Sequence, residues 1–166
     1  DNMPRSIAQH AHSLNVSLKC LNQDFSYLLN DTHLNISFAS GEGIVLPRPN
    51  LHANAVTAGI VAARYLAKEL PVNAHSLEFA VKNGYLAGRQ QVIYDTICTV
   101  LDVSHNPQAV KLLVNRVNAL RNEKVTGKIH AVFSGLKDKD LCGLISPMCS
   151  LVDNWYSAML DSNRAA

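Results

Sequence analysis

The sequence predicts an α/β protein in which a small antiparallel meander with helices precedes an open, mostly parallel sheet. Three observations support this fold class. Short alternating segments separated by turn residues fill much of the first half. After about residue 92, strand-like and helix-like segments alternate, which is typical of right-handed parallel crossovers. Residues 85–91, between the two patterns, have no periodicity, and we interpret them as an interdomain hinge.

The predicted meander lies in the first half. A short helix is expected after Ser6. Residues 16–21 and 33–38 alternate between apolar and polar side chains, and residues 44–46 continue the pattern after Gly41-Glu42-Gly43. Alternation of this kind is typical of strands with one buried face.

Two helices are predicted after the meander. The first covers residues 51–70, where apolar side chains recur at helical spacing until Pro71. The second is expected to end at Asn83-Gly84. Five elements follow beyond the hinge. They are a strand, a helix, a strand, a helix that Pro147 kinks or splits, and a strand, over residues 97–103, 107–120, 129–133, 140–152 and 155–159.

Composition excludes several classes of protein. The 166 residues carry a formal net charge of +2, and the basic residues are scattered, unlike the Lys/Arg stripe of a nucleic-acid binder. No apolar run is long enough to span a bilayer, and there is no signal-peptide pattern. Cys20, Cys98, Cys142 and Cys149 have neither CxxC nor zinc-finger spacing. They predict reduced thiols in a cytoplasmic protein.

The end of the strand at 97–103 is the first candidate site, because ligands of open parallel sheets bind beyond the carboxyl ends of strands. Asp102, Ser104 and His105 stand there, before Asn106 and Pro107, which suit a helix N-cap and first helical position. A helix N-terminus favours anions, so the Asp suits ribose hydroxyls or a cation-held phosphate, and the His a carboxylate or phosphate. Alternatively, Asn106-Pro107 only starts a helix and His105 is a surface residue. The residues alone favour neither interpretation.

The second candidate is the loop Ser134–Asp140, at the next strand end. Gly135 gives a sharp exit from the strand, and Asp140 can cap the following helix. Lys137 and Lys139 are expected to bracket a small anionic pocket near the first strand end. A solvated charged loop is the alternative, and it is the stronger interpretation of this loop taken alone.

Two residues outside these loops also belong to the candidate set. Arg89 lies in the hinge, where a guanidinium can clamp phosphates, and Asn54 lies in the first turn of the helix predicted at 51–70. Spacing alone favours an ordinary exposed Arg and a first-turn hydrogen bond for Asn54. The sequence contains no GxxxxGK[ST], GxGxxG, GxSxG or HExxH pattern, so the phosphate-binding loop of an ATP-using enzyme would lie outside this chain.

Taken in order, four motifs resemble the folylpolyglutamate synthase/dihydrofolate synthase family, relatives of the Mur peptide-precursor ligases. They are Asn-Ala-x-Thr-Ala at 54–58, Gly-Arg at 88–89, D-x-x-H-N-P at 102–107 and Asp-Lys-Asp at 138–140. The stretch Val-Asp-Asn-Trp-Tyr at 152–156 is similar to the bacterial bifunctional type. Ala87 departs from the family, which usually has Pro before Gly-Arg.

The resemblance implies a fold and a division of the chain. Residues 1–84 would be the end of a Mur-ligase-type central ATPase domain, residues 85–91 the interdomain hinge, and residues 92–166 part of a Rossmann-like C-terminal domain of the Mur ligase type. Both ends of the chain are then expected to be cut edges of a longer protein.

The resemblance also implies an ATP-dependent acid–amino-acid ligase of folate biosynthesis and one-carbon metabolism. It would add L-glutamate to dihydropteroate and/or to folate (poly)glutamates through an acyl phosphate. ATP and Mg²⁺ are the implied cofactors, with the metal ligands upstream of this chain and none within it. The full-length enzyme would be a monomer that binds small molecules and neither nucleic acid nor membrane, and the fragment alone would be inactive.

Site residues are carried over position by position. Asn54, Arg89 and Asp102 match positions that contact ATP in the family. His105 matches a cleft residue near the glutamate and acyl phosphate, which implies a catalytic and glutamate-binding role, and Lys139 matches a basic position that holds the incoming amino acid's carboxylate in the Mur relatives. Two other functions remain open: a Mur-type peptidoglycan-precursor ligase, and a non-catalytic nucleotide-binding module.

Overall fold

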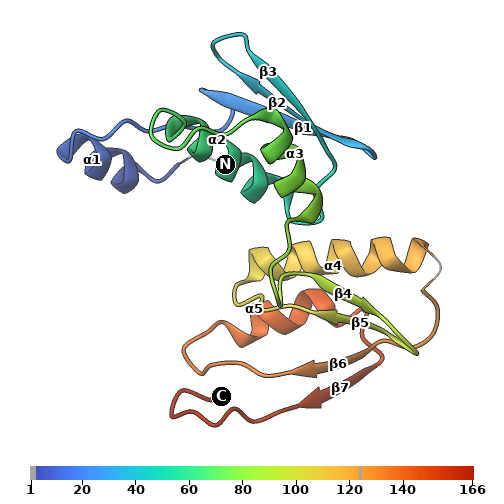
Figure 1. Ribbon diagram of the computed structural model, residues 1–166. Helices are drawn as coiled ribbons and strands as arrows, with labels where there is room; N and C mark the ends of the chain where they lie inside the picture. The colour runs from blue at the N-terminus through green and yellow to red at the C-terminus, as the bar shows by residue number, and fades with distance from the viewer. Residues whose placement is uncertain (1–2, 124) are drawn as a thin grey trace. The chain divides into compact units, whose positions relative to one another are not determined.

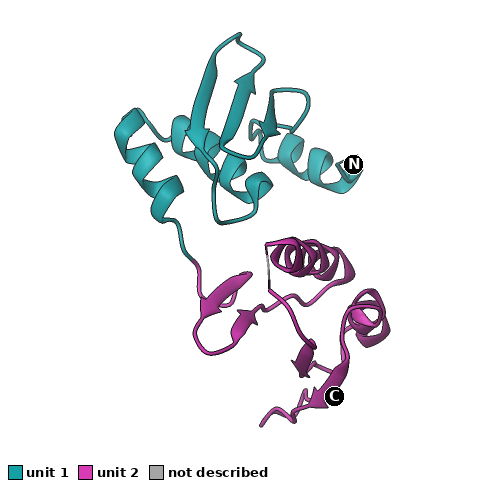
Figure 2. Cartoon of the chain, turned by 90° about the vertical axis from the view of Figure 1, so that its right-hand side faces the viewer, with its two compact units in different colours: residues 1–85 teal, residues 86–166 magenta. Residues whose placement is uncertain are grey.

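The computed structural model describes residues 3–123 and 125–166, shown as a ribbon in Figure 1. The chain divides into two compact units, Asp1–Tyr85 and Leu86–Ala166, coloured separately in Figure 2. Both units combine helices with strands, and one strand pair is parallel, which confirms the predicted α/β class. No helix in the described part of the chain is long and apolar enough to cross a membrane. All four cysteines have free thiols.

Unit 1 is a three-stranded antiparallel sheet with three helices. The strands follow the order β1-β2-β3, so the meander predicted around 33–38 and 44–46 is confirmed. The elements are α1 (Arg5–Ser13), β1 (Phe25–Leu29), β2 (His33–Phe38), β3 (Gly43–Pro47), α2 (Ala53–Tyr65) and α3 (Ala74–Asn83).

The core of unit 1 lies between its sheet and α2 and α3. Leu34 and Ile36 of β2 are 0% and 1% exposed, and they pack with Leu46 of β3, Ile60 of α2 and Val81 of α3. Burial of an aliphatic side chain of this size contributes about 1.5–3 kcal/mol. This packing fixes α2, and with it the first-turn residues of that helix.

The strand predicted at 16–21 is wrong. Only Leu21 makes an isolated bridge, to Phe25, and Val16 is 57% exposed, so the alternating pattern has no core to face. Backbone turns flank the segment on both sides. Asn15 and Asn22 have left-handed φ angles of 53° and 65°. The first strand starts later, at Phe25.

The helix predicted over 51–70 is also shorter, because it ends at Tyr65. Leu66 and Leu70 continue the apolar pattern but are 53% and 64% exposed. Without buried contacts in this unit, the last residues before Pro71 form turns rather than a continued α-helix.

Unit 2 contains two two-stranded sheets and the helices that cover them. β4 pairs with β5 antiparallel, and β6 pairs with β7 parallel. Pro147 lies where α5 gives way to a 3₁₀ helix, as predicted. The elements are β4 (Gln91–Tyr94), β5 (Cys98–Leu101), α4 (Pro107–Asn122), β6 (His130–Phe133), α5 (Leu141–Ile145), the 3₁₀ helix η1 (Ser146–Met148) and β7 (Asn154–Ser157).

Two features of unit 2 differ from the expected continuous sheet. The strand β4 was not predicted, because it is only four residues long, begins at the last residue of the predicted hinge and ends directly before the bend at Asp95-Thr96. In addition, β5 and β6 are not hydrogen-bonded to each other among the described residues, so the three predicted strands do not form one sheet. The helices nevertheless pack as expected, with Val110 and Leu120 of α4 and Leu144 of α5 buried.

Candidate functional site

The Asp102 carboxylate organises the end of β5. Its Oδ2 accepts a hydrogen bond of 2.8 Å from the Gln90 backbone N–H, and its Oδ1 accepts one of 2.8 Å from the Ser104 N–H. The side chain is half-buried. One carboxylate therefore connects the segment after Arg89 with the loop that leads into α4.

The segment around Arg89 is fixed to the same strand end. The Val103 N–H donates to the Gly88 carbonyl over 2.8 Å, and the residues on either side of Arg89 have left-handed φ angles, 66° at Gly88 and 48° at Gln90. A side chain at Gly88 would also crowd Val103, since a Cβ there would lie 3.1 Å from its Cγ1. Arg89 itself is exposed, and its guanidinium has no hydrogen-bond partner in the described part of the chain.

The start of α4 has the predicted cap. Asn106 Oδ1 accepts a hydrogen bond of 2.8 Å from the Ala109 N–H, and Pro107 is the first helical residue. The exposed His105 ring has Nδ1 3.1 Å from the Val103 carbonyl oxygen. A carbonyl can only accept, so this contact requires the proton on Nδ1 and leaves Nε2 as a free acceptor in the neutral ring.

The loop between β6 and α5 is held by the end of the chain. Arg164 Nη2 donates to both carboxylate oxygens of Asp138 over 2.8 Å, and Lys137 Nζ donates to the Asn163 carbonyl over 2.8 Å. The Arg164 guanidinium lowers the pKa of Asp138 below the ordinary value of 3.8. Lys139 is half-buried, with Nζ 3.4 Å from Asp138 Oδ2.

These contacts alter the expected role of the two lysines. Each ammonium group already has one partner, the Asn163 carbonyl for Lys137 and the Asp138 carboxylate for Lys139, so an anion bound here would share Lys139 with Asp138. The predicted cap is present, because Asp140 Oδ1 accepts a hydrogen bond of 2.9 Å from the Gly143 N–H. Gly135 makes the predicted tight exit, since a Cβ there would lie 2.6 Å from Leu141 Cδ2.

The two loops are neighbours because α4 and α5 touch at their first turns. A Cβ on Gly143 would lie 2.7 Å from Pro107 Cγ, which places the backbone of α5 directly against the first residue of α4. The structure thus brings the loops of Arg89, Asp102, His105 and Lys139 to one end of unit 2. Asn54 belongs to unit 1, where it is exposed in the first turn of α2.

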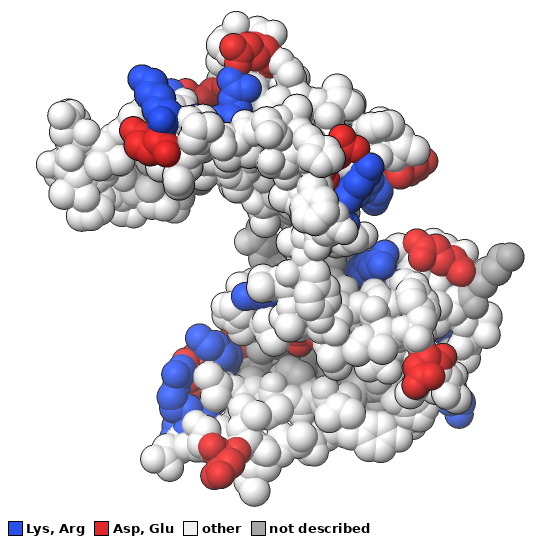
Figure 3. Space-filling view, in the orientation of Figure 1, with Lys and Arg blue, Asp and Glu red and all other residues white. Residues whose placement is uncertain are grey.

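A cavity of about 690 Å³ begins at this end of unit 2. Asp102 and Ser104 line it together with apolar residues of α4, β5 and β6. Among residues 3–123 and 125–166, no group of three or more His, Cys, Asp or Glu side chains is placed to hold a metal ion. On the face shown in Figure 3, positive and negative side chains are interspersed and form no continuous basic stripe.

The sequence did not identify three of these residues as part of the site. Gln90 and Gly143 contribute through their backbones, which spacing does not reveal. Arg164 lies 26 residues after Asp138 and carries no motif. Only the Asp138-Lys139-Asp140 triplet pointed to a charged cluster at this place.

No protein-family model matches this chain. The dihydrofolate synthase/folylpolyglutamate synthase of Escherichia coli (strain K12) is 33% identical over 165 residues, which cover 99% of this chain and 38% of that protein. The structure of E. coli FolC in complex with DHPP and ADP matches with a TM-score of 0.86 at 30% identity, over 99% of this chain and 38% of that one.

A second solved structure has a different set of ligands. It is a bifunctional folylpolyglutamate synthase/dihydrofolate synthase with Mn, AMPPNP and L-glutamate bound, and it matches with a TM-score of 0.85 at 32% identity. The match covers 99% of this chain and 39% of that one. The chain therefore spans about two fifths of the length of the relatives it matches.

Proposed function

We propose that this chain is part of an ATP-dependent ligase of folate biosynthesis, because it is similar over 99% of its own length to one part of a dihydrofolate synthase/folylpolyglutamate synthase. The whole enzyme adds L-glutamate to dihydropteroate and/or to folate (poly)glutamates. The 166 residues alone are inactive, because they amount to 38% of the relative's length. The whole enzyme acts in the cytoplasm as a monomer on small molecules.

The proposed reaction has two steps. A carboxylate oxygen of the pterin substrate attacks the γ-phosphorus of ATP, and the bond to ADP breaks. The amine nitrogen of L-glutamate then attacks the acyl carbon, the bond to phosphate breaks, and the nitrogen loses a proton as the amide forms. The protein's task in the first step is to align the reactants and to stabilise the charge on the transferring group.

We assign nucleotide contacts to Asn54, Arg89 and Asp102. Arg89 is exposed and unpaired among the described residues, so its charge is available to a phosphate. Asp102 lies beside Arg89, because its Oδ2 accepts a hydrogen bond from the backbone of the next residue, Gln90. Each carboxylate oxygen can accept more than one hydrogen bond, so the Asp102 oxygens are suited to bind ribose hydroxyls. Both residues lie at the carboxyl end of β5, where such ligands bind in open sheets.

We assign the glutamate end to His105 and Lys139. The free Nε2 of His105 is suited to accept a proton from the attacking amine. The Lys139 ammonium group lies 3.4 Å from the Asp138 carboxylate, so it would interact with Asp138 and with the carboxylate of L-glutamate at the same time. Mg²⁺ would neutralise charge on the phosphates when bound. The described residues offer no ligand set for it, so we assign no metal ligand to this chain.

The domain assignment is part of the same proposal. Residues 1–84 form the end of the central ATPase domain, and residues 92–166 form part of the C-terminal domain. The two compact units, with their boundary between Tyr85 and Leu86, support this division.

The observation that carries the proposal is the Asp102 carboxylate, which holds the segment of Arg89 at a strand end in a chain with these relatives. The test is an assay of the full-length protein with ATP, L-glutamate and either dihydropteroate, tetrahydrofolate or a UDP-linked muramyl substrate. Glutamate transfer to a pterin is expected. Transfer of an amino acid to the muramyl substrate alone, or nucleotide binding without any product, would overturn the proposal.

A further inference from the structure

Residues 162–166 lie antiparallel beside the loop that follows β6. The Lys137 N–H donates to the Arg164 carbonyl over 2.9 Å. Two residues further along, the Ala166 N–H donates to the Gly135 carbonyl over 3.0 Å. The backbone around Arg164 is therefore held on the loop without any contribution from its side chain, and the guanidinium extends from a defined place.

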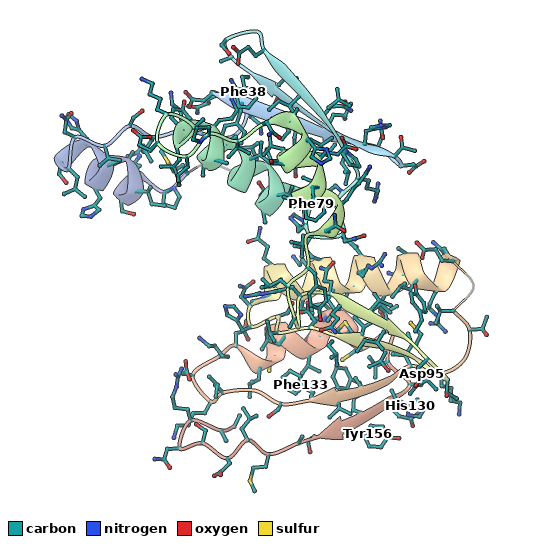
Figure 4. The ribbon with its side chains drawn as sticks, viewed as in Figure 1. Phe38, Phe79, Asp95, His130, Phe133 and Tyr156 are labelled. Carbon is teal, nitrogen blue, oxygen red and sulfur yellow. The ribbon has the colours of Figure 1, made fainter. Side chains whose placement is uncertain are left out.

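The loop itself has a packed base. Phe133, labelled in Figure 4, is the last residue of β6, and its ring contacts that of Trp155 on β7 edge to face, with 6.3 Å between the ring centroids. A Cβ at Gly135 would lie 3.3 Å from Cζ of Phe133 and 2.6 Å from Cδ2 of Leu141. The strand and the following helix thus enclose the start of the loop, so the backbone that carries its charged side chains is held from both sides.

The Asp138 carboxylate lies between two cations that contact it unequally. Nε and Nη2 of Arg164 donate to Oδ1 over 3.2 Å and 2.8 Å, and Nη2 also reaches Oδ2 over 2.8 Å. The Lys139 Nζ approaches Oδ2 only to 3.4 Å, which is longer than a charge-assisted hydrogen bond of about 2.7–2.9 Å. The guanidinium is therefore the principal partner of Asp138, and the ammonium group is the secondary one.

These three side chains leave one positive charge in excess. Arg164 and Lys139 are both cations, and a single anion, Asp138, lies between them. In the described part of the chain, Asp138 is the only carboxylate in an ion pair with Lys139. Without Arg164, the Asp138 carboxylate would neutralise Lys139 alone and draw the ammonium group towards itself. An added carboxylate would then meet no net charge, so its attraction to Lys139 would be weaker.

The remaining charged residues of the loop have other partners. Lys137 Nζ donates over 2.8 Å to the Asn163 carbonyl, a neutral acceptor. Asp140 Oδ1 accepts the Gly143 N–H over 2.9 Å and so caps α5. The distribution of charge at this loop therefore depends on which cation Asp138 holds.

We propose that Arg164 is a positioning residue for the carboxylate of the incoming L-glutamate and that it acts through Asp138. Its guanidinium holds Asp138, so Lys139 can bind a substrate carboxylate while Asp138 keeps a cationic partner. The loop of Lys139 lies at the end of unit 2 that also carries His105, to which we assign the amine of L-glutamate. This inference rests on the assignment of Lys139 in the proposed function.

A double-mutant cycle in the full-length enzyme tests how Arg164 acts. Arg164→Gln is expected to raise the KM for L-glutamate about 2- to 5-fold, the size of an exposed ion-pair effect, with little change in kcat or in the KM for ATP. Asp138→Asn should lower the KM for L-glutamate, because it removes the acid that shares Lys139. Arg164→Gln should then have no further effect in the Asp138→Asn background.

An equal rise in KM in both backgrounds would overturn the proposal, since Arg164 would then contact L-glutamate directly or only secure the loop. This comparison also covers a variant in which residues 162–166 detach, because detachment would act in both backgrounds. Lys82→Gln, which removes a cation from an exposed ion pair on α3, is the matched control. The same rise in the control would contradict a role for this loop.

Crystal structures of the full-length protein test the distribution of charge without reference to activity. In Arg164→Gln, the Lys139 Nζ is expected to move from 3.4 Å to about 2.7–2.9 Å from the Asp138 carboxylate, the length of a charge-assisted hydrogen bond. An unchanged separation would overturn the role of Arg164, whether or not residues 162–166 stay in place. No glutamate transfer by the unaltered enzyme would instead refute the proposed function, so the two failures are distinguishable.

Discussion

Gly143 lies against Pro107, and the contact leaves no room for a side chain on the glycine. A Cβ at Gly143 would meet the proline ring at 2.7 Å and the Asp140 carboxylate that caps α5. Gly143→Ala should therefore separate the first turns of α4 and α5 and weaken the cap, with a cost of about 1–3 kcal/mol, as for an overpacked core. Denaturant unfolding of the chain measures the effect.

Gly59→Ala is the matched control for this substitution. Gly59 lies in the interior of α2, and a Cβ there meets nothing within 4 Å in this chain. Since alanine favours a helix over glycine, the control should be neutral or gain up to about 1 kcal/mol. Equal stability of the two variants would contradict the proposed contact between the helix beginnings.

Arg89→Ala should impair the use of ATP without affecting the fold. The guanidinium is exposed and makes no hydrogen bond among the described residues, so its loss leaves no intramolecular contact broken. Loss of a charge-assisted contact to phosphate costs about 1.5–3 kcal/mol, which corresponds to about a 10- to 100-fold loss in kcat/KM for ATP. Steady-state kinetics of the full-length enzyme provide the measurement, and Arg5→Ala, an exposed arginine of α1, is the control. Unchanged ATP kinetics in Arg89→Ala would refute its role.

Asp102→Ala should differ from Arg89→Ala because it affects both stability and ATP use. It removes the acceptor of the Gln90 and Ser104 N–H groups, and each half-buried donor left unpaired costs about 1–3 kcal/mol. Thermal unfolding and ATP kinetics should therefore both change, with faster hydrogen exchange at Gln90 and Ser104. Lower ATP use with unchanged exchange at these two amides would show that the two hydrogen bonds do not hold the loop.

His105→Ala should reduce the use of L-glutamate more than the use of ATP. If Nε2 takes the amine proton, the loss appears in kcat for glutamate transfer, whereas the KM for ATP changes little. Lys139→Gln should instead raise the KM for L-glutamate with little change in kcat. A His105→Ala enzyme with an unaltered kcat would exclude the proposed proton transfer.

The Asp138–Arg164 ion pair should depend on pH only in acid. The lowered pKa of Asp138 means that the pair is intact above the ordinary aspartate pKa of 3.8 and is lost as the pH falls through the lowered value. NMR titration of the Asp138 carboxyl should show its pKa rise towards 3.8 in Arg164→Gln. The Glu78 carboxyl, whose pKa Lys82 lowers, should be unaffected by that substitution and serves as the internal control.

Local signals in the sequence predicted helix boundaries better than strand partners. Asn106-Pro107, Asp140 and Pro147 each act within one turn of helix, and all three behave as expected. The alternation at 16–21 failed because burial, which decides whether an alternating segment becomes a strand, depends on distant residues. For the same reason the pairing of β4 with β5 could not be read from four residues.

The candidate site shows the same limit. The motifs around Asp102 and Asp138 placed two polar loops at strand ends, and the structure brings these loops together. The contacts that hold them come from backbone groups of Gln90 and Gly143 and from Arg164, far along the chain. Backbone donors carry no residue signature, so spacing and residue type could not have revealed them.

The two hydrogen bonds of Asp102 also have a thermodynamic consequence. They fix its carboxylate before a ligand binds. Binding of a ligand that donates a hydrogen bond to this carboxylate therefore does not include the cost of immobilising a free side chain, about 0.5–1.5 kcal/mol. The Gln90 end of that arrangement has a left-handed backbone, φ 48°, within the segment that follows the unit boundary. By reciprocity, any change that relaxes the backbone of Gln90 weakens the binding of such a ligand, and the bound ligand in turn opposes that relaxation. The affinity of a ligand for Asp102 and the backbone order of residues 88–91 are therefore thermodynamically coupled.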